Sequence, residues 1–314
     1  MTGYRSLALA NNPAFLPLIG TYEPSGIQQL PDGRFIVVED EPQQALSVID
    51  IDRDGSVRCT ALRPSGLQDS GDDFWDLDDL EGVAVDHAGY VYAITSHSRD
   101  GAGCEKASRE RLVRFRVEGD RIAEPMVTSG LKRALIADHP VLAAAAAILD
   151  VKKDGGLNIE ALTMSADQTR LLVGLRSPLL DRQALIATIE NPQAVFEAAA
   201  EPLIGATLTT LDLGGNGIRG MSYIPRLAGY LLIGGPIARS RAPFELWFWS
   251  GDRADRARRV SVAGLAGFEH AEGLCPAVIG GQPHLVIVSD DGNRKHGRSA
   301  RFLVLDLEQL RIED

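Results

Sequence analysis

Five short segments of the sequence share one pattern: Ser25-Gly26-Ile27, Glu81-Gly82-Val83, Glu160-Ala161-Leu162, Arg219-Gly220-Met221 and Glu272-Gly273-Leu274. In each segment a polar residue precedes a small residue and then an apolar one. The segments recur about every 50 to 80 residues, as expected of the blades of a β-propeller. The sequence therefore predicts an all-β protein built from repeated sheets.

The residues that follow each segment predict a β-hairpin. Pro31-Asp32-Gly33 precedes the apolar run Phe35–Val38, and Asp86-His87-Ala88-Gly89 precedes Tyr90–Ile94. Turn residues followed by β-branched and aliphatic residues are typical of a turn and its returning strand. Further strands such as Phe302–Asp306 lie farther along each repeat. Each repeat is thus predicted to form one blade.

Five segments predict a five-bladed β-propeller, and a diverged sixth blade in one of the longer intervals remains an alternative. A propeller leaves no open sheet edge when a strand from the opposite terminus completes its last blade. The residues before Ser25 and after Glu272 together make one blade, and Phe15–Gly20 is the predicted closing strand. We expect a single propeller domain over residues 1–314.

Helical segments interrupt this β pattern twice. Leu131–Leu149 contains an alanine run and is interrupted by Pro140, which predicts a small helical insertion between blades two and three. Asn191-Pro192 predicts the start of a second short helix, with Asn191 as its cap. We expect both to pack over the blades without a direct role. Alternatively, the insertion contacts a protein partner.

Composition narrows the classes of partner. A net charge of -11 disfavours nucleic acid, because Lys and Arg supply most of the affinity for phosphate backbones. No apolar stretch approaches the roughly 20 residues of a membrane span, and the run at residues 7–10 is too short for a secretory leader. Three widely spaced cysteines fit reduced thiols. We predict a cytoplasmic protein with no nucleic-acid or membrane partner.

Polar residues are predicted to converge at one mouth of the channel. The first strand of a blade begins at the same face at which the second strand ends. The polar residues of the five segments should therefore form an inner ring. Around this ring we expect residues at the ends of the second strands and in the loops that follow: Asp40, Ser96, His97, Arg99, Arg176, Asp290, Asp291 and Asn293. Among these, we predict that Asp40, Ser96, Asp290, Asp291 and Asn293 bind the ligand.

The inner ring poses an electrostatic problem, because Glu81, Glu160 and Glu272 repel one another near one axis. A bound cation would relieve the repulsion, and oxygen ligands favour calcium or magnesium over zinc. Alternatively, Arg219 sits among the carboxylates in a structural ion cluster. In a third interpretation each Glu accepts backbone amides where a strand begins, and the following Gly permits close approach. The sequence leaves these alternatives open.

Catalytic candidates lie in the same region. His97 beside Arg99 could act as a general base next to an anion clamp, or both could belong to a solvated loop. Arg176 and Arg219 are the other cations predicted at the mouth. The sequence contains no Gly-x-Ser-x-Gly, Walker or zinc-protease motif.

Asp79–Ala84, Thr95–Arg99 and Ile218–Met221 give the chain a family resemblance. The chain resembles, over nearly its whole length, a bacterial family named only as domain of unknown function thirty-six sixteen, which carries no assigned activity. Arg219–Pro225 and Glu272–Leu274 also resemble segments of the calcium-dependent apyrases and of phytase-like esterase propellers. The apyrase likeness implies calcium bound by Glu81, Glu160, Ser222 and Glu272, with Arg99 and Arg176 near phosphate groups.

These features together predict a cytoplasmic propeller that binds a small anionic ligand at the channel mouth. The expected reaction is divalent-metal-dependent hydrolysis of a phosphate or related ester. His97, Arg99, Arg176 and Arg219 are its predicted catalytic residues. The alternative is a non-catalytic interaction or sensor module. A lectin-like role is disfavoured, because the chain has only three tryptophans.

Overall fold

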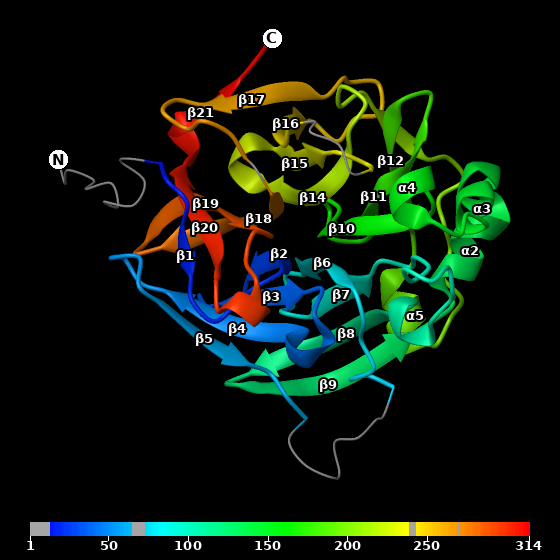
Figure 1. Ribbon diagram of the computed structural model, residues 1–314, viewed down its shortest axis with the longest axis horizontal. Helices are drawn as coiled ribbons and strands as arrows, with labels where there is room; N and C mark the ends of the chain where they lie inside the picture. Colours follow the sequence, from blue (N-terminus) through cyan, green and yellow to red (C-terminus); the bar gives the residue numbers. More distant parts are fainter. Residues whose placement is uncertain (1–12, 65–72, 239–242, 269) are drawn as a thin grey trace.

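Five antiparallel sheets surround a common axis in the computed structural model (Figure 1), which describes residues 13–64, 73–238, 243–268 and 270–314. The five-bladed propeller predicted from the repeats is therefore confirmed. The described residues contain no sixth sheet, and helices occupy the longest interval between repeated segments. The leader examined at residues 7–10 lies outside the described residues.

Each blade runs from an inner strand at the axis to an outer strand at the rim. Blade one consists of β2 (Pro24–Gln29), β3 (Phe35–Glu39), β4 (Leu46–Ile51) and β5 (Val57–Ala61), and blade two of β6 (Leu80–Val85), β7 (Val91–Thr95), β8 (Leu112–Glu118) and β9 (Arg121–Thr128). Blade three consists of β10 (Asn158–Met164), β11 (Leu171–Leu180), β12 (Gln183–Ile189) and β13 (Thr209–Leu211). Blade four contains β14 (Gly217–Ile224), β15 (Gly229–Gly235), β16 (Glu245–Trp249) and β17 (Arg258–Val262), and blade five β18 (Ala271–Ile279), β19 (Gln282–Ser289) and β20 (Ala300–Asp306).

The two ends of the chain cover the edges of the last two blades. As predicted, the N-terminal strand β1 (Leu16–Leu18) completes blade five by pairing antiparallel with β20. The C-terminal strand β21 (Leu310–Ile312) pairs with β17 and gives blade four a fifth strand, which the sequence did not indicate. Both additions cover main-chain groups that an edge strand would leave unpaired.

Helices form where the sequence predicted them. The predicted insertion Leu131–Leu149 contains α2 (Leu131–Asp138) and α3 (Pro140–Ala146), and Pro140 begins α3. A further helix that was not predicted, α4 (Val151–Asp154), follows it. The second helix is α5 (Pro192–Glu197). Contrary to the prediction, the Asn191 side chain does not cap α5; it bonds instead to main-chain groups of Glu201 and Leu203. Single 3-10 turns occur at Pro42–Gln44, Ala107–Arg109, Pro225–Leu227, Arg294–His296 and Leu307–Gln309.

The core consists of apolar layers packed between neighbouring blades. Phe35, Phe115 and Phe302 are almost completely buried in these layers. Trp247 and Trp249 are also buried, so neither offers an exposed stacking platform for a sugar ring. None of the helices in the described part of the chain is long and apolar enough to cross a membrane.

Candidate functional site

A β-bulge aims one polar side chain from each blade toward the axis. In all five inner strands the pairing register shifts at the polar residue of the repeated segment, namely Ser25, Glu81, Glu160, Arg219 and Glu272. A bulge leaves the extra residue outside the ladder and redirects its side chain. All five side chains line one cavity on the propeller axis. The repeated segment is thus the local signal for a bulge and for the ring.

The small residue that follows each bulge lets neighbouring inner strands touch through their backbones. A Cβ atom on Gly82 would lie 2.7 Å from the amide nitrogen of Leu162, and one on Gly220 would overlap the carbonyl oxygen of Glu272. Beyond the ring, the space between the inner strands is only about 10 Å³, room for a single water at most. A ligand in the ring therefore cannot pass along the axis.

On the open side of the ring lies a cavity of about 800 Å³, which we call the axial cup. Its volume is that of a site for a small molecule. Besides the ring, its charged lining residues are Asp40, Asp79, Arg99, Asp100, Arg109, Asp150, Lys152, Lys153, Arg176 and Asp290. The cup is therefore strongly polar and carries both signs of charge.

The short helix α4, which follows the predicted insertion Leu131–Leu149, contributes directly to the cup. Asp150 caps α4 by accepting a hydrogen bond from the Lys153 amide at 3.2 Å, and Lys152 and Lys153 line the rim. Neither ammonium group forms an ion pair with the described residues. The rim thus gains two cations from α4, whereas no residue of Leu131–Leu149 lines the cup.

One side of the cup is an ion cluster around Glu160. Arg176 Nη1 donates a hydrogen bond to Glu160 Oε1 at 2.9 Å, and Arg219 Nε forms an ion pair with Glu160 Oε2 at 2.9 Å. Arg219 also forms an ion pair with Glu272. Burial lowers the pKa of Arg219, and the charge of Glu160 opposes this shift. The arginine cluster proposed from the sequence is therefore present.

The predicted calcium or magnesium ligands do not fit a metal centre. Glu160 and Glu272 are occupied by the arginines, and Ser222 accepts a hydrogen bond from Gln28 Nε2 at 3.1 Å and does not line the cup. In the described ranges no group of three or more His, Cys, Asp or Glu residues is arranged to hold a metal ion. Of the four predicted ligands, only Glu81 lines the cup without an arginine partner, so the four residues do not form the predicted metal site.

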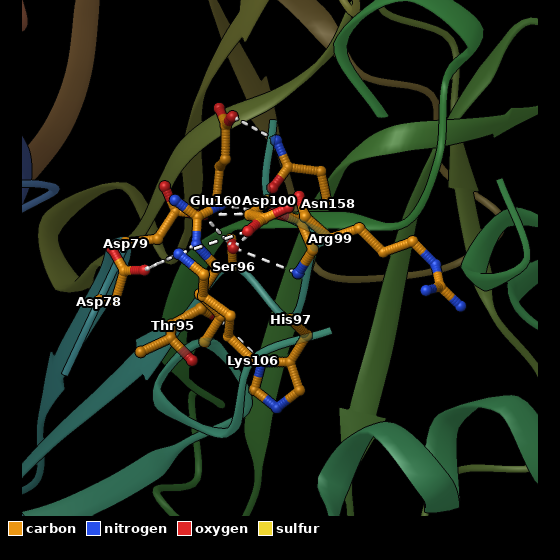
Figure 2. A network of polar contacts seen from close by, with 12 residues as sticks. Asp78, Asp79, Thr95, Ser96, His97, Arg99, Asp100, Lys106, Asn158 and Glu160 are labelled. Atoms are coloured by element: carbon orange, nitrogen blue, oxygen red, sulfur yellow. Dashed lines mark hydrogen bonds and ion pairs between the residues drawn. The ribbon is translucent and has the colours of Figure 1, made fainter. Parts of the chain in front are cut away.

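The opposite side of the cup is acidic and is organised by Asp79, which the sequence analysis did not select. Asp79 Oδ2 accepts hydrogen bonds from Ser96 Oγ and from Ser98 Oγ, the latter at 3.2 Å (Figure 2). The same oxygen lies 2.9 Å from Arg109 Nη1. Asp79 adopts the left-handed φ of 66° just before β6, a conformation uncommon outside glycine.

Two further carboxyl groups complete the acidic side. Burial and the neighbouring Asp79 carboxylate raise the pKa of Asp40 to about 8. Burial also raises the pKa of Glu81 well above its ordinary value, with Glu160 as the next cause. Glu81 is 8% exposed and forms no hydrogen bond or ion pair with the residues described, although it lines the cup. Burial therefore favours the protonated form of both carboxyl groups.

The histidine predicted as general base does not face the cup. His97 is completely buried with a φ of 56°, its ring points away from the carboxyl groups (Figure 2), and it is absent from the cup lining. Its Nδ1 lies 2.8 Å from the Thr95 carbonyl oxygen, and burial lowers the pKa of His97 to about 4. The predicted role of His97 is therefore wrong, because the left-handed backbone turns its ring into the protein.

Arg99 lines the cup with part of its side chain, but its guanidinium points away (Figure 2). Nε donates to the Ala146 carbonyl and Nη1 to the Gly103 carbonyl, both at 3.1 Å, and Nη2 pairs with Glu105 at 3.0 Å. The first contact ties Arg99 to α3, and the other two lie within its own loop. Arg99 is therefore corrected from an anion clamp to a tether.

The remaining predicted ligand-binding residues divide into two groups. Asp290 lines the cup, and burial together with Glu23 raises the pKa of Asp290 to about 6. Ser96 is buried beneath Asp79. Asp291 pairs with Arg301, and Asn293 accepts a hydrogen bond from the His296 amide at 3.0 Å. Of these four residues only Asp290 lines the cup, and the structure does not place Ser96, Asp291 or Asn293 in its lining.

The fold and the cup define a five-bladed propeller whose axial cup is built from one aimed side chain per blade. The chain belongs to the phytase-like family, described as having the esterase-like activity of phytase, whose model matches residues 20–233. This match supports the weaker of the resemblances drawn from the sequence, that to phytase-like esterase propellers. Among curated proteins, none matches the chain.

Solved structures resemble the chain in architecture at low sequence identity. The major allergen Mala s 1 of Malassezia sympodialis is 10% identical with a TM-score of 0.50, and the match covers 95% of each chain. A putative oxidoreductase (glucose dehydrogenase) of Thermus thermophilus is 16% identical over 93% of this chain and 100% of that one, with a TM-score of 0.46. The PQQ-bound aldose sugar dehydrogenase of Streptomyces coelicolor is 17% identical over 98% and 100%, with a TM-score of 0.45. At these identities the likeness concerns the fold alone.

Proposed function

We propose that the protein binds a small anionic ester in the axial cup and hydrolyses it. The observation that carries this proposal is that one cavity of about 800 Å³ is lined both by cations and by buried carboxyl groups with raised pKa values. The cations can hold the negative charge of the substrate, and a protonated carboxyl group can donate a proton to its leaving group. Membership of a family described by esterase-like activity supports the reaction class.

The cations would hold the substrate by its negative charge. Lys152 and Lys153 lie at the rim without ion-pair partners among the described residues. Deeper in the cup, Arg176 donates from Nε to the Pro236 carbonyl at 3.1 Å and from Nη1 to Glu160. Its Nη2 has no hydrogen bond to the described part of the chain, so its two N–H groups are available to a ligand in the cup. A guanidinium fixed on two sides is preorganised to stabilise charge on an oxyanion.

The mechanism follows from these residues without a metal. Arg176 stabilises the negative charge that develops on the ester as water attacks, while Arg219 keeps the Glu160 and Glu272 carboxylates neutralised beneath it.

Cys59, Cys104 and Cys275 form no disulfide, which supports placing the activity in the reducing cytoplasm.

Replacement of Arg176 by glutamine tests the anion site. We expect Arg176→Gln to lower kcat/KM for p-nitrophenyl phosphate at least about 100-fold, because one charge-stabilising donor is lost from the transition state. The uncharged ester p-nitrophenyl acetate should lose less activity. Arg170→Gln, which removes a half-exposed arginine outside the cup, is the matched control.

Initial rates of hydrolysis, with thermal unfolding as a check on folding, decide the outcome. If the protein hydrolysed neither of the two p-nitrophenyl esters and also failed to hydrolyse myo-inositol hexakisphosphate, the proposed function would be contradicted. Equal losses in the Arg176 and Arg170 variants would contradict the assignment of Arg176.

A further inference from the structure

Asp40 and Asp79 form a carboxyl pair at the junction of blades one and two. Asp40 follows β3 and Asp79 precedes β6. The amide of Asp79 donates to the Asp40 carbonyl at 3.3 Å, so the backbones hold the two residues side by side. The Asp79 side chain raises the pKa of Asp40 by its charge and by hydrogen bonding. Both line the axial cup.

Three donors converge on one carboxyl oxygen of Asp79. Ser96, Ser98 and Arg109 all approach Oδ2. Hydrogen bonds from such donors, one of them a guanidinium, stabilise a carboxylate. Oδ1 of Asp79 receives none of these bonds and can accept a hydrogen bond from a protonated Asp40. Arg109 is itself held by Asp78, whose Oδ2 lies 3.0 Å from its Nε.

The surroundings of Asp40 favour the protonated form. Five ionisable groups interact electrostatically with Asp40: Glu23, Asp79, Glu81, Arg109 and Lys152. Three of the five are carboxyl groups, and burial removes Asp40 from water. Glu81, buried and unpartnered among the residues described, adds a second carboxyl group that faces the cup from the ring. A charged Asp40 would therefore add repulsion to an already acidic wall.

We propose that Asp40 and Asp79 share one proton, and that Asp40 is the general acid that delivers it to the leaving oxygen of an ester held in the cup. This proposal deepens the proposed function and rests on it. The substrate class is an ester with a basic leaving group, such as an alkyl phosphate, because such an alcohol leaves only when its oxygen is protonated.

The proton and electron balance of the step is complete. The oxygen of water forms a bond to the phosphorus or acyl carbon, and the bond to the leaving oxygen breaks with its electron pair. Asp40 gives its proton to that oxygen and becomes a carboxylate. The attacking water loses a proton to Asp290, which is ionised above a pH of about 6. Exchange through solvent returns the proton to Asp40, and Asp79 remains ionised throughout as a positioning residue.

The titration of Asp40 tests the shared proton without any substrate. Protein labelled with 13C at the aspartate carboxyls is titrated by NMR, and the Asp40 signal is identified by its loss in Asp40→Asn. In the wild type we expect a midpoint near pH 8. In Asp79→Asn the midpoint should fall by at least about one unit, because the neighbouring negative charge is gone. A wild-type midpoint near 4, or no change in Asp79→Asn, would overturn the shared proton.

Leaving-group dependence tests the donor role. Asp40→Asn should lower kcat at least about 100-fold for an alkyl phosphate. It should lower kcat much less for p-nitrophenyl phosphate, whose phenolate leaves without a proton. Asp50→Asn, on β4 and away from the cup, is the matched control and should match the wild type. Equal losses for the two esters overturn the donor role alone, whereas hydrolysis of no ester overturns the proposed function as well.

Discussion

Replacement of Arg219 by methionine is expected to lower the free energy of unfolding by about 3–5 kcal/mol, because it leaves buried carboxylates without their partner. Arg219 is the residue that joins Glu160 and Glu272, and all three are at most 8% exposed. Methionine fills much of the volume of arginine but carries no charge. Urea unfolding at pH 7 measures the loss.

Two further variants make this expectation specific. Arg219→Met combined with Glu272→Gln should recover part of the loss, because Glu160 still has Arg176 while the charge of Glu272 is removed. Arg58→Met removes the exposed arginine of a surface pair with Asp50 and should leave the urea midpoint close to that of the wild type. An Arg219→Met protein as stable as Arg58→Met would contradict the ion cluster.

Gly220→Ala is expected to destabilise the protein by about 3 kcal/mol or more, which is large for the addition of one methyl group. The new Cβ would overlap the carbonyl oxygen of Glu272 on the neighbouring inner strand. A backbone atom cannot swing away as a side chain can, so blades four and five must separate. The thermal midpoint and the urea midpoint should both fall.

Gly101→Ala is the control for this substitution, since nothing lies within 4 Å of its added Cβ and its φ is not left-handed. It should change stability by no more than about 0.5 kcal/mol. Ala161 occupies the corresponding position in blade three, where an alanine is tolerated. If Gly220→Ala were as stable as the wild type, close backbone approach could not explain the small residue of the repeated segment.

The number of blades and the ring could be predicted from the sequence because one local device is repeated. In this protein each bulge places a polar residue at the axis, and the following small residue permits close approach of the next inner strand, which leaves the same three-residue pattern in each blade. The closing strand followed from the length of chain left at the two ends. The pairing of β21 with β17 was not predictable, because nothing in three residues identifies a distant edge.

The chemistry of the cup was harder to predict, since it depends on backbone angles and distant partners. Two residues with a left-handed backbone affect which side chains reach the cup. Asp79 lines the cup, whereas the ring of His97 points away from the carboxyl groups. The cluster of carboxylates suggested a metal, but Arg176 and Arg219 already neutralise Glu160. Lys152 and Lys153 reach the rim on α4, a short helix that the sequence pattern did not predict. Charge counts along the chain contain none of this information.

The most direct test of the central claim is the position of a bound oxyanion. Crystals soaked in tungstate, a phosphate analogue with strong anomalous scattering, would show where the protein holds such an anion. We predict an anomalous peak inside the axial cup within hydrogen-bonding distance of Arg176 Nη2, and loss of that peak in Arg176→Gln crystals. Tungstate bound only outside the cup, or in the cup equally well without Arg176, would contradict the account.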